Sequence, residues 1–159
     1  MSVRVWRAEP HEAETVARLL VAFRDSFGRD WPSDNAFLAG VEKLILNVDT
    51  DLLLAAPNDD SPPTGVCQLR FRFGIWHAAT DCWLEDLYVE PASRRTGVAK
   101  ALVEFAVQQA QARGCRRMEL DVSDVNEPAI ALYQSLGFGY KSEPNKDFLM
   151  RLTLPDSQD

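Results

Sequence analysis

Six residues, Arg94-Arg-Thr-Gly-Val-Ala99, determine how the rest of this 159-residue chain is interpreted. They follow a strand-like run over residues 82–89, and they precede an amphipathic helix that we expect from about residue 97 to about residue 113. A turn between a strand and a helix directs free backbone N–H groups and the positive end of the helix dipole at an anion. Gly97 lets the main chain approach a ligand closely, and Ala99 keeps the first helical turn small. The stretch therefore predicts an anion-binding loop.

Length and composition restrict the class of protein around this loop. Hydrophobic residues make up 46% of the chain and charged residues 26%, which is typical of a globular domain, and no apolar run approaches the length of a membrane span. We expect one domain over residues 1–154 and a disordered tail over residues 155–159, in a cytoplasmic protein. The net charge of -7 argues against nucleic acid or a membrane as partner and is compatible with a cationic small molecule.

The cysteines and histidines argue against a disulfide framework and a metal site. Cys67, Cys82 and Cys115 are odd in number, widely spaced and placed in apparent strands, so we expect reduced thiols in the core. The chain has only two histidines, His11 and His77, and no spacing typical of metal ligands, so no metal is expected.

Hydrophobic periodicity predicts an α+β fold. Seven strands are expected at residues 3–7, 51–56, 65–73, 82–89, 116–122, 138–141 and 147–154. Four helices are expected at about residues 9–27, 33–48, 97–113 and 126–136. The resulting order is βααβββαβαββ.

Two adjacent carboxylates interrupt the apolar strand over residues 82–89. This strand is apolar on both faces, as a central strand is, and Glu85 and Asp86 lie in its middle. Successive strand residues point to opposite faces, so we expect at most one of the two to face a given side. A carboxylate in such a strand is either paired, with Arg70 or Arg72 as candidate partners, or used in chemistry.

A second motif begins at Asn126. Asn126 suits a helix N-cap and Pro128 suits the first helical turn, while Gly137 ends the helix. Tyr133 on this helix either packs in the core or has a chemical role, and Asn126 either caps the helix or contacts a cofactor.

The two motifs resemble the signatures of the GNAT superfamily of acyl-CoA N-acyltransferases. The loop carries the spacing Arg94-x-x-Gly-x-Ala99, and Asn126-Glu-Pro is followed by Tyr133 and then by Gly137-Phe138. The resemblance covers nearly the whole chain, because the expected element order is that of the GNAT fold. It implies a mixed, mostly antiparallel, seven-stranded sheet that is flanked by four helices and splayed between the 82–89 and 116–122 strands.

The resemblance also implies a function. A member of this family transfers an acetyl group from acetyl-CoA, as co-substrate, to a primary amine by direct attack in a ternary complex. Leu84-Glu-Asp-Leu-Tyr-Val89 together with Asn126-Glu-Pro looks most like the diamine and polyamine acetyltransferase branch, and hence a small cationic amine is the expected acceptor. A protein or peptide N-acetyltransferase, a non-catalytic CoA-binding sensor or interaction module, and assembly as a homodimer stay open.

The resemblance assigns roles to individual residues. Glu85 is implied as the general base, beside a bulge that admits the pantetheine arm, and Tyr133 as the general acid for the departing thiolate. The backbone of Leu87, Tyr88 and Val89 is implied to pair with the arm. The other implied cofactor contacts are Arg94, Arg95, Thr96, Gly97, Val98, Ala99, Lys100 and Asn126.

Weaker signals surround the expected acceptor pocket. A solvated face with an N-cap explains most of these residues equally well, but a pocket edged by carboxylates would attract a cation. The candidates for acceptor binding are Asp25, Asp30, Trp31, Asp34, Trp76 and Asp86.

Overall fold

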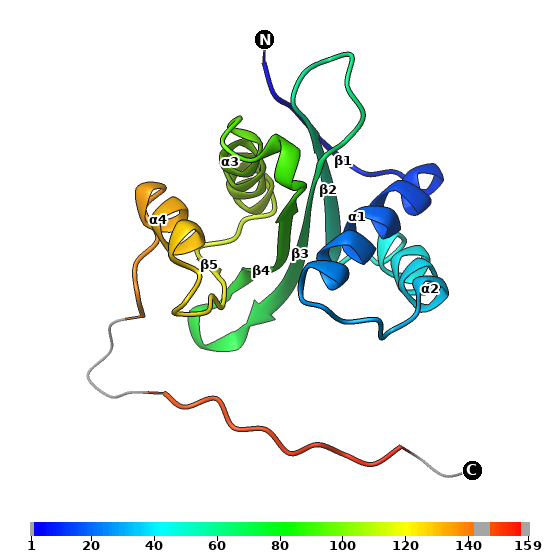
Figure 1. Ribbon diagram of the computed structural model, residues 1–159. Coiled ribbons are helices and arrows are strands. Elements are labelled where there is room, and N and C mark those ends of the chain that lie inside the picture. The colour runs from blue at the N-terminus through cyan, green and yellow to red at the C-terminus, as the bar shows by residue number, and fades with distance from the viewer. Residues whose placement is uncertain (1, 142–146, 157–159) are drawn as a thin grey trace.

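A five-stranded sheet forms the centre of the computed structural model, which describes residues 2–141 and 147–156 (Figure 1). The strands are β1 (Arg4–Arg7), β2 (Thr50–Ala56), β3 (Gly65–Gly74), β4 (Ala79–Val89) and β5 (Met118–Glu119), and they lie in that order across the sheet. The first four are antiparallel to their neighbours, and β5 runs parallel to β4. The sheet is therefore mixed and mostly antiparallel.

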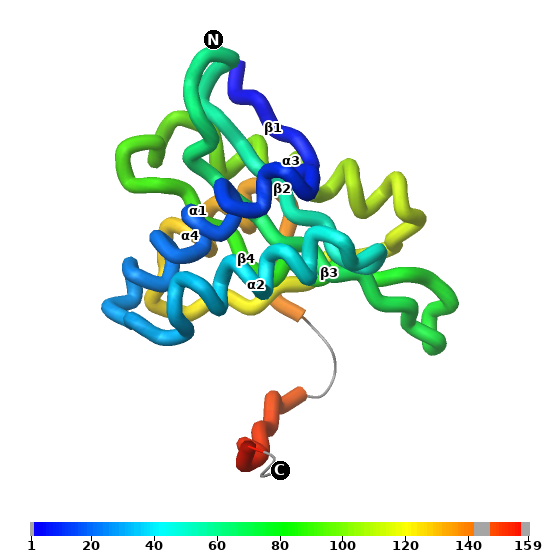
Figure 2. The backbone as a smooth tube through the Cα atoms, turned by 90° about the vertical axis from the view of Figure 1, so that its right-hand side faces the viewer, coloured from blue at the N-terminus to red at the C-terminus, as the bar shows by residue number. Residues whose placement is uncertain are grey.

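Helices cover both faces of this sheet, so the molecule has three layers with the sheet in the middle (Figures 1 and 2). The four α-helices are α1 (Ala13–Ser26), α2 (Asp34–Ile45), α3 (Val98–Ala112) and α4 (Glu127–Ser135). Three short 3-10 helices join elements: η1 (Pro10–Glu12), η2 (Ile75–His77) and η3 (Pro91–Ser93). The helices α1 and α2 pack on one face, and α3 and α4 pack on the other. Among the described residues, no helix has the length and apolar character needed to cross a membrane.

The alternation of β2 explains how one strand serves two cores. All seven of its residues are buried. Leu52 and Leu54 belong to the cluster under α1 and α2, whereas Leu53 and Ala55 belong to the cluster under α3. Period-two alternation thus divides the apolar side chains of a central strand between two layers.

The predicted order is confirmed as far as α4, and it differs at the C-terminal end. The strand expected at 116–122 pairs only over 118–119, and the segments 138–141 and 147–154 form no strand among the described residues. A strand exists only where its backbone pairs with another edge, and neither segment has such a partner here. The expected seven strands are thus five, and residues 157–159 of the expected tail lie outside the described residues.

The segment 147–156 runs clear of the body of the molecule (Figures 1 and 2). Its apolar side chains are strongly exposed, with Phe148 81% and Met150 88% accessible. The alternating pattern that predicted a strand is therefore present in the sequence, but the pairing that a strand requires is not made.

One buried carboxylate ties three elements together. Asp51 on β2 has no exposed side-chain surface and forms ion pairs with Arg7 of β1 at 3.1 Å and with Arg113, just after α3, at 2.8 Å. The guanidinium of Arg113 also lies 3.9 Å from the ring centroid of Phe71. A buried charge is tolerated when partners satisfy it, so this cluster fixes the end of α3 against the sheet.

We predict that Asp51→Ala lowers the free energy of unfolding by about 3 kcal/mol, because it leaves the cation of Arg113 unpaired in a half-buried place. Asp49→Ala is the control, since Asp49 is exposed two residues away. Urea denaturation measures both variants. Equal stability of Asp51→Ala and the wild-type protein would contradict this role for the cluster.

Candidate functional site

The loop between β4 and α3 has an unusual backbone. Arg95 has φ +65° and Gly97 has φ +85°, so two left-handed residues lie within three positions. For Arg95 this conformation costs about 1 kcal/mol, and such strained residues collect at ligand-binding sites. The hydroxyl of Thr96 donates to the carbonyl of Ser93, and Arg94 Nε donates to the carbonyl oxygen of Val89 at 3.2 Å. These bonds hold the loop against the end of β4.

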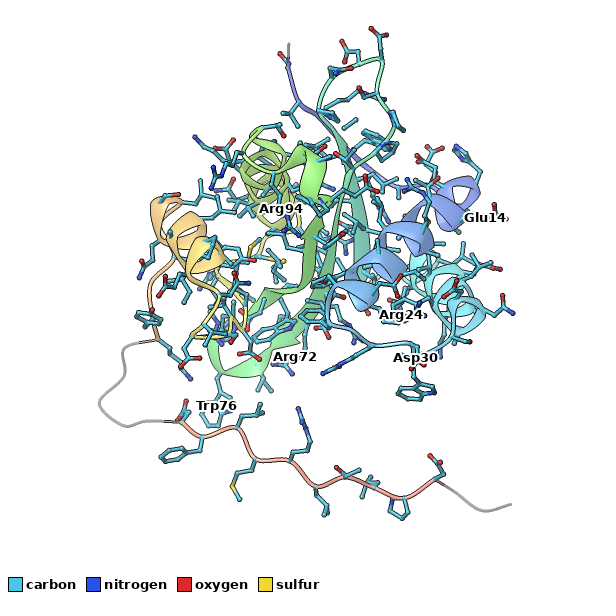
Figure 3. The ribbon with its side chains drawn as sticks, in the orientation of Figure 1. Glu14, Arg24, Asp30, Arg72, Trp76 and Arg94 are labelled. Carbon is cyan, nitrogen blue, oxygen red and sulfur yellow. The ribbon has the colours of Figure 1, made fainter. Side chains whose placement is uncertain are left out.

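The start of α3 offers free donors to an anion. The first intrahelical hydrogen bond runs from Ala101 N to the carbonyl oxygen of Gly97 at 3.0 Å, so the N–H groups of residues 98–100 have no acceptor within the helix. Arg94, Arg95 and Lys100 are exposed around it, and Figure 3 shows Arg94 beside the N-terminal end of α3. The arrangement is suited to a pyrophosphate or another polyanion.

Close packing fixes this helix end next to the last residue of β4. Gly65, which pairs with Val89, begins β3, and a Cβ added to it would lie 2.8 Å from Val98 Cγ1 and 2.9 Å from Leu102 Cδ1. Only glycine therefore lets the first turns of α3 lie this close to the sheet. The loop is held directly beyond the C-terminal end of β4.

A β-bulge interrupts β4 at Glu85. Gln68 pairs with Asp86 and Leu69 pairs with Leu84, so Glu85 is the extra residue of β4 and has no partner on β3. A bulge breaks the alternation of side chains. Leu84 belongs to the core under α3, and Leu87 packs against that same core. Both carboxylates between them lie on the other face, the face of α1 and α2. The expectation that at most one of them faces a given side is therefore wrong, because the bulge adds a residue.

The two carboxylates enter different surroundings on that face. Glu85 is exposed and borders an open depression of about 570 Å³ with Arg70, Arg72 and Trp83. Among the described residues, no ion pair joins Glu85 to either arginine. Asp86 is half-buried, and burial together with the neighbouring charge of Glu85 raises the pKa of Asp86 to about 6.

Asp86 lies at the sheet side of a cavity of about 400 Å³ between the α1–α2 pair and the β3–β4 hairpin. Gln68 lies beside it, and the remaining walls are mostly aromatic and aliphatic. They include Phe23, Phe27, Trp31, Phe37, Val41 and Leu44. The helical spacing of Phe23, Phe27 and Phe37 in the sequence is typical of core-facing side chains, and it gives no sign that they border an open cavity.

Arg24 organises the mouth of this cavity. Its side chain is only 9% exposed, forms ion pairs with Asp25 at 2.8 Å and Asp34 at 2.9 Å, and donates to the carbonyl oxygen of Pro32 at 2.6 Å. These carboxylates raise the pKa of Arg24 further. Asp25 and Asp34 thus neutralise Arg24 instead of lining the cavity. The sequence carries one signal for this pairing: Arg24 lies one helical turn after Leu20, on the apolar face of the helix, where a cation needs acidic partners.

The other acceptor candidates lie in different places. Trp31 lines the cavity, whereas Asp30 is exposed and is not among the lining residues. Trp76 is 97% exposed at the tip of the β3–β4 hairpin, at the end of the sheet opposite Arg94 (Figure 3). The lining of the cavity differs from the acidic edge that the sequence suggested, because it combines one carboxylate, that of Asp86, with Arg24 and Arg29.

The strands β4 and β5 pair only at Cys82–Met118 and Trp83–Glu119. Beyond this point, residues 84–89 of β4 have no pairing partner on the β5 side among the described residues. The splay that the resemblance implied between these strands is therefore present. It leaves the β5 side of residues 84–89 open to an extended ligand except at the carbonyl oxygen of Val89, which accepts from Arg94 Nε.

Tyr133 of α4 lies on the other side of this splay. Its side chain is 8% exposed, belongs to the core cluster under α3, and lies with its ring centroid 5.6 Å from that of Phe138. Burial, and to a lesser extent the thiol of Cys67, raises the pKa of Tyr133 to about 12. Tyr133 also borders a cavity of about 460 Å³ between β5 and α4. The phenol is protonated at neutral pH and is suited to donate a proton.

Asn126 forms the N-cap of α4, where its side-chain oxygen accepts a hydrogen bond from Ala129 N at 3.4 Å. His77 pairs with Asp81 at 2.8 Å, and Cys67 and Cys82 are buried. Among residues 2–141 and 147–156, no group of three His, Cys, Asp or Glu side chains could hold a metal ion.

Comparison with known proteins matches this geometry to one family. The model of the acetyltransferase (GNAT) family matches residues 16–138. The thialysine N-epsilon-acetyltransferase of Bos taurus is 31% identical over 87 residues, which make up 54% of this chain and 51% of that protein. The chain thus spans about half the length of the curated relatives at the head of this comparison.

Solved structures agree over the whole chain. A probable acetyltransferase has a TM-score of 0.83 at 28% identity and covers 98% of this chain and 99% of its own. The aminoglycoside acetyltransferase HMB0005, from an uncultured soil metagenomic sample, has a TM-score of 0.74 at 25% identity, with coverage of 99% and 100%. The chain belongs to the GNAT family of acetyltransferases, for which acetyl-CoA is the co-substrate.

Proposed function

We propose that this protein transfers the acetyl group of acetyl-CoA to the primary amine of a small molecule by direct attack in a ternary complex. The observation that carries this proposal is the position of the anion-binding loop, directly beyond the end of the strand that carries the carboxylate bulge. A cofactor held by its phosphates at the loop and extended along β4 would present its thioester near Glu85 and Asp86.

The loop residues would hold the diphosphate of acetyl-CoA. The N–H groups of residues 96–100 would donate to the phosphate oxygens, and Arg94 and Arg95 would add charge-assisted contacts. The pantetheine arm would run along Leu87, Tyr88 and Val89, where β4 has no neighbouring strand on its β5 side among the described residues. Asn126, at the start of α4, would border the arm from the opposite side of the splay.

The chemistry then requires a base, an oxyanion donor and an acid. An amine with a pKa of about 10 is protonated at neutral pH, so Glu85, which is open to solvent, accepts its proton directly or through water. The N–H of Leu87 stabilises the oxyanion. Tyr133, with its pKa near 12, protonates the departing thiolate. No covalent acyl-enzyme is needed, because the buried thiols have no histidine partner among the described residues.

We predict that acetyl-CoA raises the melting temperature of the wild-type protein, by an amount equivalent to about 2.7 kcal/mol when the ligand is a hundredfold above its Kd. Gly97→Glu should abolish this shift, because a carboxylate in the loop repels the phosphates. Gly114→Glu is the matched control: Gly114 has φ +78°, also has open space around its Cβ, and lies at the far end of α3. Loss of the shift in both variants, or in neither, would contradict the location of the phosphates.

We predict that Tyr133→Phe lowers kcat about 100-fold while the Kd of acetyl-CoA stays nearly unchanged, because the hydroxyl acts on the leaving thiolate. The control is Tyr140→Phe, since Tyr140 is 73% exposed. Release of free thiol, measured with a chromogenic reagent, gives both rates. Full activity of Tyr133→Phe would show that Tyr133 only packs in the core and has no role in proton transfer.

A further inference from the structure

We propose that the cavity between the α1–α2 pair and the β3–β4 hairpin binds the acceptor, and that this acceptor is a primary amine with one positive charge on an apolar body, anchored by Asp86. The inference rests on the acetyl transfer proposed above and adds the place, the orientation and the chemical class of the acceptor.

The walls determine the body of the ligand. Among the lining residues, aromatic and aliphatic side chains from both helices predominate, notably Phe23, Phe37 and Leu44. The ring of Phe23 lies 5.0 Å from Phe27 and 5.1 Å from Tyr88, centroid to centroid, so ring contacts hold this wall against β4. A cavity of about 400 Å³ accommodates a chain of several carbons or a single ring.

The carboxylate of Asp86, at the sheet side of the cavity, determines the charge of the ligand. Asp86 is half-buried, and among the described residues no cation pairs with it. Its pKa of about 6 leaves it ionised at neutral pH, within a cavity whose walls are mostly apolar. An unpaired carboxylate there is stabilised by a ligand that brings a positive charge. The amide side chain of Gln68, on the paired residue of β3, offers a further polar contact.

The mouth excludes a second positive charge. Arg24 and Arg29 both line the cavity. Asp25 and Asp34 offset the charge of Arg24, whereas Arg29 forms no ion pair in the described residues and lies over Phe27, 5.9 Å from its ring centroid. A diamine anchored at Asp86 would bring its distal ammonium toward this cation. An uncharged alkyl or aryl end meets the aromatic and aliphatic walls without this repulsion.

The bulge orients the bound amine for reaction. Asp86 holds the ammonium, and Glu85, on the same face one residue earlier, takes a proton from it directly or through water. The nitrogen lone pair then forms the C–N bond to the thioester carbonyl, the C–S bond breaks, and the sulfur keeps the electron pair and takes the proton of Tyr133. The second proton lost from nitrogen restores the phenol. One proton is released in total, with the N-acetylated amine and free CoA.

Binding is tested with hexylamine in a thermal-shift assay, separately from catalysis. We expect hexylamine to raise the melting temperature of the wild-type protein but not that of Gly40→Leu. Gly40 lines the cavity from α2, and an added Cβ meets no atom within 4 Å, so leucine fills the space without straining the helix. Ala39→Leu is the matched control on the exposed side of α2. An equal hexylamine shift in Gly40→Leu and Ala39→Leu would overturn the proposed location.

The role of Asp86 is tested with Asp86→Asn, which we expect to raise the KM for hexylamine at least about tenfold while the Kd of acetyl-CoA stays unchanged. Folding raises the pKa of Asp86, so its ionisation opposes folding, and stability is lost as the pH rises from about 3.8 to about 6. Glu85, Arg24 and Arg29 are the charged groups around it. Asp86→Asn should therefore also raise the melting temperature of the free protein at pH 7. A variant with lowered stability and unchanged KM would show a purely structural role.

Specificity is tested by the thiol-release rates of hexylamine and 1,6-diaminohexane, which differ only in the second ammonium. We expect kcat/KM for hexylamine to be roughly tenfold higher. Equal rates, or a preference for the diamine, would overturn the acceptor class while acetyl transfer itself stands.

The outcomes also separate the acceptor site from the proposed function. No turnover of either amine, together with a normal acetyl-CoA shift and no hexylamine shift, would overturn the acceptor site. Absence of the acetyl-CoA shift would overturn the proposed function instead.

Discussion

The single extra residue in β4 is the constraint on which the site depends. Without the bulge at Glu85, strict alternation would place Asp86 on the face of α3, inside an apolar core where an ionised carboxylate is costly. With it, both carboxylates face α1 and α2, while Leu84 and Leu87 keep their places in the core under α3. The bulge thus places two adjacent carboxylates on one face of a central strand, while the residues on either side of them keep their packing in the core.

The same strand has two different neighbours along its length. Toward β3 it is paired throughout except at the bulge, whereas toward β5 it is paired at two positions only. Its C-terminal half is therefore rigid on one side and open on the other, which is the combination that an extended cofactor requires. The loop with Arg95 and Gly97 lies at the end of this open half, and close packing at Gly65 holds α3 there. Burial of Tyr133 across the splay places a protonated phenol on the remaining side.

Local patterns predicted the parts of this architecture that depend on local physics. The turn at 94–99, the four helices and the central strands follow from periodicity and capping, and their bounds differ from the structure by only a few residues. The bulge depends on how β3 and β4 pair, so the 82–89 segment alone does not reveal it, and only the family resemblance implied a bulge there. The pairing of Asp25 and Asp34 with Arg24 depends on how two helices meet. The strands expected after residue 137 need a sheet edge, and an alternating sequence does not supply one.

A bisubstrate ligand, coenzyme A whose sulfur is joined through an acetyl spacer to the nitrogen of hexylamine, tests most directly whether the two sites meet at the bulge. If the loop holds the phosphates while the cavity beside Asp86 holds the alkyl chain, one molecule occupies both sites. Its Kd, measured by calorimetry, should then be at least about 100-fold lower than that of acetyl-CoA. A Kd equal to that of acetyl-CoA would show that the alkyl chain gains nothing, and that the acceptor does not approach the thioester from this face of β4.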